Sequence, residues 1–205
     1  MKASSLDLLV AVLAALSAPP ANAGGAGSDR SPVEPRVQNE DVAIQNEASG
    51  VTLSGTLTTP EGPGSFPAAM LLSVGLPNDR DMTHPNGPKL FRTLAEHLAR
   101  NGIATLRCDD RGVGGSTGSY FETTISDLAD DALAGVEFLR KRAGIDPLKV
   151  GVIGNSEGAM VGAIAASRSD HVTFVVMLAG VGVRAEEVLR ERTLSRARKN
   201  SYPRT

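Results

Sequence analysis

The chain contains few of the residues that most often build metal, redox and base-stacking sites. Its 205 residues include one cysteine, three histidines and no tryptophan, and aromatic residues account for 3% of the total. Cys108 has no partner for a disulfide within the chain, and sites that need several cysteine ligands are excluded. Three scattered histidines argue against a histidine-rich metal site, so neither a metal nor another cofactor is expected. The scarcity of aromatic rings and a net charge of −2 predict no nucleic-acid partner.

The N-terminal segment has the pattern of a secretory signal peptide. Lys2 provides a positive start, the run 8–16 is entirely apolar, and the A-N-A sequence at 21–23 matches a small-residue cleavage site. The apolar run is too short to cross a bilayer, which takes about 20 residues. Residues 1–23 therefore predict export to the periplasm or the medium without stable membrane insertion, and the mature chain is expected to begin at Gly24.

Beyond this segment, the chain predicts a flexible leader at 24–40, rich in glycine, serine and proline, and a single domain over 41–205. Short apolar runs alternate with segments of helical periodicity in that domain. The expected strands are 42–45, 51–58, 68–73, 103–108, 150–153 and 172–178, and the expected helices are 89–101, 124–142 and the segment after Ser156. This alternation predicts an α/β fold, with a mostly parallel sheet and helices on both faces.

One short motif carries the strongest chemical signal. Ser156 stands at the centre of G-N-S-E-G, directly after the apolar run 150–153 and before the small and apolar run 159–166. This is the G-x-S-x-G nucleophile elbow of an α/β-hydrolase, in which a sharp strand-to-helix turn exposes the serine hydroxyl. The small residues beside the serine let strand and helix approach closely. The alternative is an ordinary glycine-rich turn between a strand and a helix.

Two further loops are expected at the same edge of the sheet, where the strands end and ligands bind in open α/β folds. They are 73–81, with the sequence N-D-R-D, and 109–118, with the sequence D-D-R-G-V-G-G-S-T-G. Together with V-T-L-S-G-T-L and G-N-S-E-G, these motifs make the chain similar to exported α/β-hydrolases of the esterase and serine-aminopeptidase-like group. The resemblance runs from about residue 50 to residue 190.

The resemblance implies a role for several residues. Ser156 would be the nucleophile that accepts an acyl group, and the backbone N–H of Glu157, with one from the Gly75–Leu76 turn, would form the oxyanion hole. Leucine stands at 76 where the family commonly has glycine, and a positive φ there would strain it. The implied pocket residues are Asp110, Arg111 and Asn155. From the residues alone, Asp109, Asp110 and Arg111 are instead expected to hold a turn together by hydrogen bonds.

The histidine that should activate the serine is missing from its expected place. In this fold the acid and the histidine follow the serine along the chain, and the only histidine after Ser156 is His171. His171 precedes the strand 172–178, which places it at the opposite edge of the sheet. His97 belongs to a helix, so His84 is the one substitute expected at the correct edge. The resemblance implies two further strands bearing the acid and the histidine, and we therefore expect the sheet to lack its last strands.

These observations predict a serine hydrolase that acts on small carboxylic esters or related acyl compounds through an acyl-Ser156 intermediate. Two alternatives stay open from the sequence. One is hydrolysis of a peptide or amide. The other is a truncated, non-catalytic protein that binds a ligand in the same pocket without turnover. No residue identifies the acyl group or the leaving group.

Overall fold

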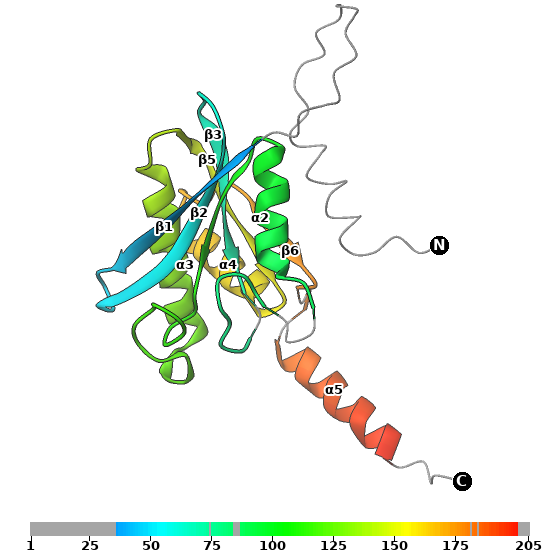
Figure 1. Ribbon diagram of the computed structural model, residues 1–205. Coiled ribbons are helices and arrows are strands. Elements are labelled where there is room, and N and C mark those ends of the chain that lie inside the picture. The colour runs from blue at the N-terminus through cyan, green and yellow to red at the C-terminus, as the bar shows by residue number, and fades with distance from the viewer. Residues whose placement is uncertain (1–35, 74, 84–86, 181, 184, 201–205) are drawn as a thin grey trace, which may run out of the picture.

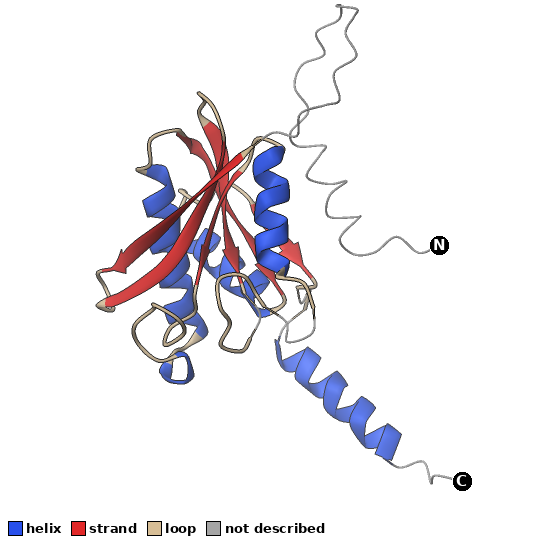
Figure 2. Cartoon of the chain, in the orientation of Figure 1, coloured by secondary structure: helices blue, strands red, loops and turns tan. Residues whose placement is uncertain are grey.

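The computed structural model describes residues 36–200, except 74, 84–86, 181 and 184. Six strands form one sheet in the order β1-β2-β4-β3-β5-β6 (Figures 1 and 2). The strands are β1 (Val37–Asn46), β2 (Val51–Pro60), β3 (Phe66–Leu72), β4 (Ala104–Cys108), β5 (Ile145–Asn155) and β6 (Val175–Leu178). The helices are α2 (Leu90–Arg100), the short 3-10 helix η1 (Tyr120–Glu122), α3 (Ile125–Arg140), α4 (Glu157–Arg168) and α5 (Ala185–Asn200).

The sheet is mostly parallel, as the alternation of elements predicted. β4, β3, β5 and β6 pair in parallel, while β1 and β2 join them as an antiparallel hairpin at one side. Because the four parallel strands all run the same way, the loops that follow β3, β4 and β5 meet at one edge of the sheet. The predicted convergence of 73–81, 109–118 and the elbow at one edge is therefore confirmed.

Helices cover both faces of this sheet (Figure 1). Alternate residues of β3 divide between the two faces: Ala69 and Leu71 pack with Leu94 of α2, whereas Met70 packs with Val136 of α3 in a second cluster that also takes in Val161 of α4. Successive side chains of a strand point to opposite faces, so one short apolar strand contributes to the core on both sides of the sheet. A capping box begins α3, since the side chains of Thr124 and Asp127 each bond the other's backbone N–H.

The largest differences from the expected strands are in β1, β5 and β6. β1 begins at Val37 and takes in 37–40, which the composition had assigned to the leader; its polar residues fit because most of this edge strand is exposed. β5 begins at Ile145, ahead of the apolar run, and residues 147–149 of that extension are exposed. β6 is only four residues long, because 172–174 lie before the strand pairing with β5 begins. Residues 1–23 lie outside the described residues.

A buried charged network joins three separate parts of the chain. Asp131 of α3 accepts hydrogen bonds from Arg111 (2.6 Å from Nε and 2.8 Å from Nη2) and from Asn46 at the end of β1 (2.7 Å). All three side chains belong to buried residues. The network therefore fixes the loop after β4 against α3 and the β1–β2 hairpin. Within it, the Asp131 carboxylate is the counter-charge of the Arg111 guanidinium.

Replacing Asp131 with alanine is expected to lower the free energy of unfolding by about 3–5 kcal/mol, because it leaves a buried guanidinium without its partner. Asp130→Ala is a matched control on the adjacent residue, since the Asp130–Arg168 pair is exposed at the surface. Such a pair contributes roughly 0–1 kcal/mol. Urea unfolding followed by circular dichroism measures both changes, and equal effects of the two substitutions would contradict the assigned role of Asp131.

The outer side of the sheet at β6 is open. Within the described residues, β6 pairs with β5 alone, and Met177 on this strand is 46% exposed. α5 does not cover this edge but extends away from the sheet in Figure 1. An edge strand with unpaired backbone groups and an exposed apolar side chain is a template for pairing with another chain.

We expect the chain that begins at Gly24 to self-associate as its concentration rises, and Met177→Lys to reduce this association by placing a charge on the edge strand. Static light scattering over a concentration series measures the effect. Leu148→Lys serves as the control, because Leu148 is also an exposed apolar residue (77%) but lies in β5, which is an inner strand. A monodisperse monomer at all concentrations would show that the open edge has no such consequence.

Candidate functional site

The backbone at Ser156 has the strained geometry of a nucleophile elbow. Ser156 lies between the last residue of β5 and the first residue of α4, with φ 55° and ψ −109°. Positive φ is costly for a residue with a side chain and persists where the surrounding structure enforces it. Here the Ser156 N–H donates a 2.8 Å hydrogen bond to the carbonyl of Leu178 at the end of β6. The turn is thus tied to the neighbouring strand.

The glycines beside Ser156 are required by close backbone contacts. A Cβ at Gly154 would lie 2.1 Å from the carbonyl oxygen of Gly158, and a Cβ at Gly158 would lie 2.3 Å from the carbonyl oxygen of Leu72 in β3. Backbone cannot yield to such contacts as a flexible side chain can. The prediction that small residues allow strand and helix to approach closely is confirmed at both positions.

Glu157 presents its backbone and its side chain to different parts of the site. As the first residue of α4, its N–H has no acceptor within the helix and lies where the positive end of the helix dipole favours an anion. Its carboxylate accepts a 2.8 Å hydrogen bond from the Tyr120 hydroxyl. Burial and this carboxylate together raise the pKa of Tyr120. A Cβ at Gly75 would lie 2.6 Å from Glu157 Oε2, so the loop after β3 rests on this side chain.

The strain expected at Leu76 is absent. Among the described residues other than glycine, positive φ is confined to Met82, Ser156 and Ala179. The expectation that leucine at 76 restricts the loop through its backbone conformation is therefore wrong. The side chain of Leu76 is instead directed to solvent, with 65% of its surface exposed.

The two aspartates after β4 bind the neighbouring loop 73–82 as well as their own turn. Asp109 accepts hydrogen bonds from the backbone N–H of Arg80 (2.8 Å), from its Nε (3.1 Å) and from its Nη2 (2.7 Å), and a longer one from the Gly115 N–H (3.3 Å). Burial acts to raise the pKa of Asp109, but the hydrogen bonds from Arg80 outweigh it and hold the pKa below its usual value. The turn-holding interpretation is thus confirmed for Asp109, whose main partner lies on another loop.

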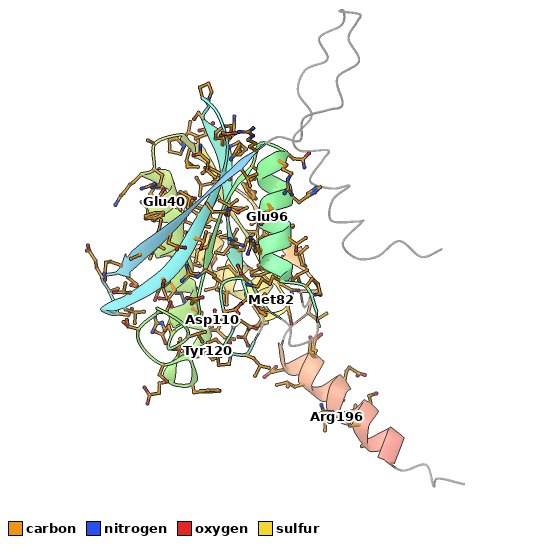
Figure 3. The ribbon with its side chains drawn as sticks, in the orientation of Figure 1. Glu40, Met82, Glu96, Asp110, Tyr120 and Arg196 are labelled. Atoms are coloured by element: carbon orange, nitrogen blue, oxygen red, sulfur yellow. The ribbon has the colours of Figure 1, made fainter. Side chains whose placement is uncertain are left out.

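Asp110 carries no counter-charge of this kind. Its carboxylate accepts hydrogen bonds from the Ser73 hydroxyl (2.9 Å) and from the Asn78 N–H (2.8 Å). Burial raises the pKa of Asp110 to about 6, against the opposing effect of these hydrogen bonds. Figure 3 shows Asp110 and Tyr120 at the same end of the molecule, close to the loops that follow the parallel strands.

Two of the three predicted pocket residues lie together in the structure, and the third lies apart from them. Asp110 and Arg111 line a small internal cavity of about 50 Å³ together with Glu157, beneath the first turn of α4. Asn155 lies elsewhere, with its Nδ2 4.0 Å from the sulfur of Met82. The cavity is far smaller than the roughly 300–1,000 Å³ of ligand pockets, and Ser156 is not part of its lining. The hydrogen bonds of Asp110 go to the loop after β3, and those of Arg111 go to Asp131 of α3.

Two residues of this edge were not assigned a role from the sequence. Arg80 belongs to the N-D-R-D sequence, and its role could have been predicted from the opposite charge of D-D-R-G, which follows the neighbouring strand of the sheet. Tyr120 follows a run of glycines and turn residues with no pattern that relates it to Glu157. Its contact becomes evident only from the folded arrangement of the loops.

No base stands beside the serine in the part of the chain that the structure describes. The Ser156 hydroxyl makes no hydrogen bond there. His171 contacts Glu137 of α3 through Nδ1 and precedes β6, at the edge opposite to Ser156 as predicted. His97 lies on α2 beside Asn101. His84 falls outside the described residues.

The described residues offer neither a metal site nor a membrane-spanning helix. No group of three or more histidine, cysteine, aspartate or glutamate side chains is arranged there to hold a metal ion. None of the helices in that part of the chain combines the length and apolar character that crossing a membrane requires.

Comparison with known proteins places this geometry in a family. Residues 89–203 match the family described as serine aminopeptidase, S33. Esterase EstD from Thermotoga maritima is 36% identical over 140 residues, which is 68% of this chain and 33% of that protein. The chain therefore spans about a third of the length of this curated relative.

Solved structures show the same fold. The Pyrococcus furiosus esterase Pf2001 aligns with a TM-score of 0.56 and 28% identity, over 75% of this chain and 56% of that one. The α/β hydrolase GrgF from a Penicillium species aligns with a TM-score of 0.55 and 20% identity, over 82% of this chain and 57% of that one. The fold is therefore the α/β-hydrolase fold, of which the chain covers part. Because the family match takes in more than half of the sequence, the protein belongs to the serine aminopeptidase, S33 family of α/β-hydrolases.

Proposed function

We propose that this chain carries the nucleophile and the oxyanion-binding part of a carboxylic ester hydrolase. The observation that carries the proposal is the strained turn at Ser156, held between β5 and α4 by backbone contacts that exclude any side chain at Gly154 or Gly158. A mere connecting turn has no need of such strain, whereas a nucleophile elbow does. The names of EstD and Pf2001, both esterases, support an ester substrate.

In the proposed reaction, the Ser156 oxygen bonds to the carbonyl carbon of a small ester while its proton passes to a base. The negative charge that develops on the carbonyl oxygen is stabilised by the free N–H of Glu157 and by a backbone N–H of the Gly75–Leu76 turn. The tetrahedral species then loses the alcohol, which takes up the proton, and leaves an acyl-serine. Water releases the acid in a second, equivalent step. The base is not among the described residues.

We expect the purified chain to hydrolyse p-nitrophenyl acetate slowly, at about 10⁻³ s⁻¹ or below, because loss of the base costs up to roughly 10⁶ in kcat while oxyanion stabilisation and binding persist. Ser156→Ala should abolish this slow rate and the acetylated Ser156 peptide found by mass spectrometry. A Ser156-dependent rate above about 1 s⁻¹ would show that a base is present, and His84→Ala then tests whether His84 supplies it.

A second candidate is hydrolysis of a peptide or amide, which the family description of a serine aminopeptidase favours. A third is ligand binding without turnover, which the missing base among the described residues favours. Comparing p-nitrophenyl acetate with alanine p-nitroanilide separates the first two. An acyl-Ser156 adduct that forms with neither compound supports the third.

We also propose that the protein is exported, from the pattern of residues 1–23, which lie outside the described residues. Expression of the full chain in a bacterial host is expected to give a periplasmic product that begins at Gly24. Mass spectrometry of the N-terminal peptide measures this, and a product that keeps residues 1–23 would count against export.

A further inference from the structure

The loop that follows β3 is held at both of its ends by one carboxylate. Ser73, just after β3, donates its hydroxyl to Asp110 at 2.9 Å, and the backbone N–H of Asn78 donates to the same side chain at 2.8 Å. The Asp110 N–H in turn donates to the Asn78 carbonyl at 3.0 Å. The Gly75–Leu76 turn lies between these two anchor points. Asp110 therefore closes the loop 73–78 into a ring.

Little else fixes that turn in the described part of the chain. Leu76 is 65% exposed and contributes no apolar anchor. The Asn78 side chain donates to the Leu76 carbonyl, which is a contact within the loop itself, and also bonds Asp110. Glu157 supports Gly75 from below, and its carboxylate can only accept hydrogen bonds. The position of the loop relative to Ser156 consequently depends on Asp110.

The charged groups around Asp110 are occupied with one another. Arg80 binds Asp109, Arg111 binds Asp131, and the Tyr120 hydroxyl donates to Glu157. The remaining titratable neighbour, Cys108, is buried, and burial raises its pKa, so the thiol is neutral. Among the described residues, the Asp110 charge is thus balanced only by the neutral donors of the loop 73–78.

We propose that Asp110 is a positioning residue that holds the Gly75–Leu76 turn in place for the oxyanion of the Ser156 reaction. This inference rests on the proposed function. Asp110 touches no reacting atom; it acts through the loop that supplies the second oxyanion donor. The carboxylate form holds the loop most strongly, because the Asn78 N–H can only donate and hydrogen bonds to a charged acceptor are stronger than those to a neutral one.

The charge that this role requires weakens the fold. Burial raises the pKa of Asp110 to about 6 from a model-compound value of 3.8. Between these values the folded state binds more protons than the unfolded state, so this group's contribution to stability falls as pH rises from about 4 to about 6. At neutral pH Asp110 is ionised in the folded and the unfolded state, and its contribution to stability has reached its lowest value. A buried charge that lowers stability is expected where a site needs it.

Hydrogen–deuterium exchange of the peptide 73–80 tests the inference, with rates corrected for the intrinsic effect of pH. In the wild-type chain, protection of this peptide is expected to fall about tenfold from pH 7.5 to pH 5, the order expected for losing a hydrogen bond to a charged group. Asp110→Asn should show the low protection at both pH values. Asp79→Asn is the matched control, because it makes the same chemical change in the same loop, and among the described residues the Asp79 side chain bonds the N–H groups of Asp81 and Thr83 instead.

The slow Ser156-dependent hydrolysis of p-nitrophenyl acetate provides the second readout. Asp110→Asn should lower kcat by about 10²-fold, the order for misplacing or losing one oxyanion donor, with KM little changed. Ser73→Ala should act in the same direction and add little to Asp110→Asn in the double variant. If protection of 73–80 in the wild-type chain is the same at the two pH values, the inference is overturned. This result holds even if Asp110→Asn fails to fold. A lower rate of Asp110→Asn with unchanged protection of 73–80 would overturn the inference as well. Absence of any Ser156-dependent rate contradicts the proposed function, and hydrogen–deuterium exchange alone then decides the inference.

Discussion

The backbone contact between β5, α4 and β3 is the constraint on which the rest of the site depends. The carbonyl of Gly158 lies against Gly154, and the carbonyl of Leu72 lies against Gly158, so three elements meet without side chains between them. At this separation the chain must reverse within one residue, and that residue is Ser156 with φ 55°. The strain at the serine is therefore a consequence of how closely the helix packs on the sheet. The strain is sustained by the tightly packed interior on both faces.

A second constraint is electrostatic and acts between the loops after β3 and β4. Arg107, Asp109 and Asp110 come at or just beyond the end of β4, and each holds a different point of the neighbouring loop. Arg107 Nη1 lies 3.1 Å from Asp81 Oδ1, while Asp109 and Asp110 bind Arg80 and Asn78. Beyond the end of the backbone hydrogen bonds between β3 and β4, side-chain interactions thus keep the two following loops together. Apolar packing is poorly suited to this, because loops of this kind run over the surface and meet solvent.

The fold was predictable wherever local pattern and tertiary structure agree. The helical face of 89–101, the capping box at Thr124 and the alternation of β2 all follow from residues within one element. The first half of β1 was missed because an exposed edge strand carries no apolar pattern, and its ladder with β2 supplies the order instead. Ser156 was predictable for the same local reason, since strand, turn and helix are consecutive. The partners of Arg80 and Tyr120 were not, because their contacts join positions 29 and 37 residues apart.

The division between local and non-local parts also explains how the turn at Ser156 can be fully formed with no base beside it among the described residues. Every contact that fixes the Ser156 backbone comes from β3, β5, α4 and the end of β6, all within the described residues. In a serine–histidine pair the histidine contacts the serine hydroxyl and not its backbone, so it has no part in that backbone geometry. The turn at Ser156 and the loop after β3 therefore form a structural unit whose integrity does not depend on a base. In such a unit, the groups that matter most under the proposed reaction are those that position backbone N–H donors, and the half-buried Asp110 belongs to that class.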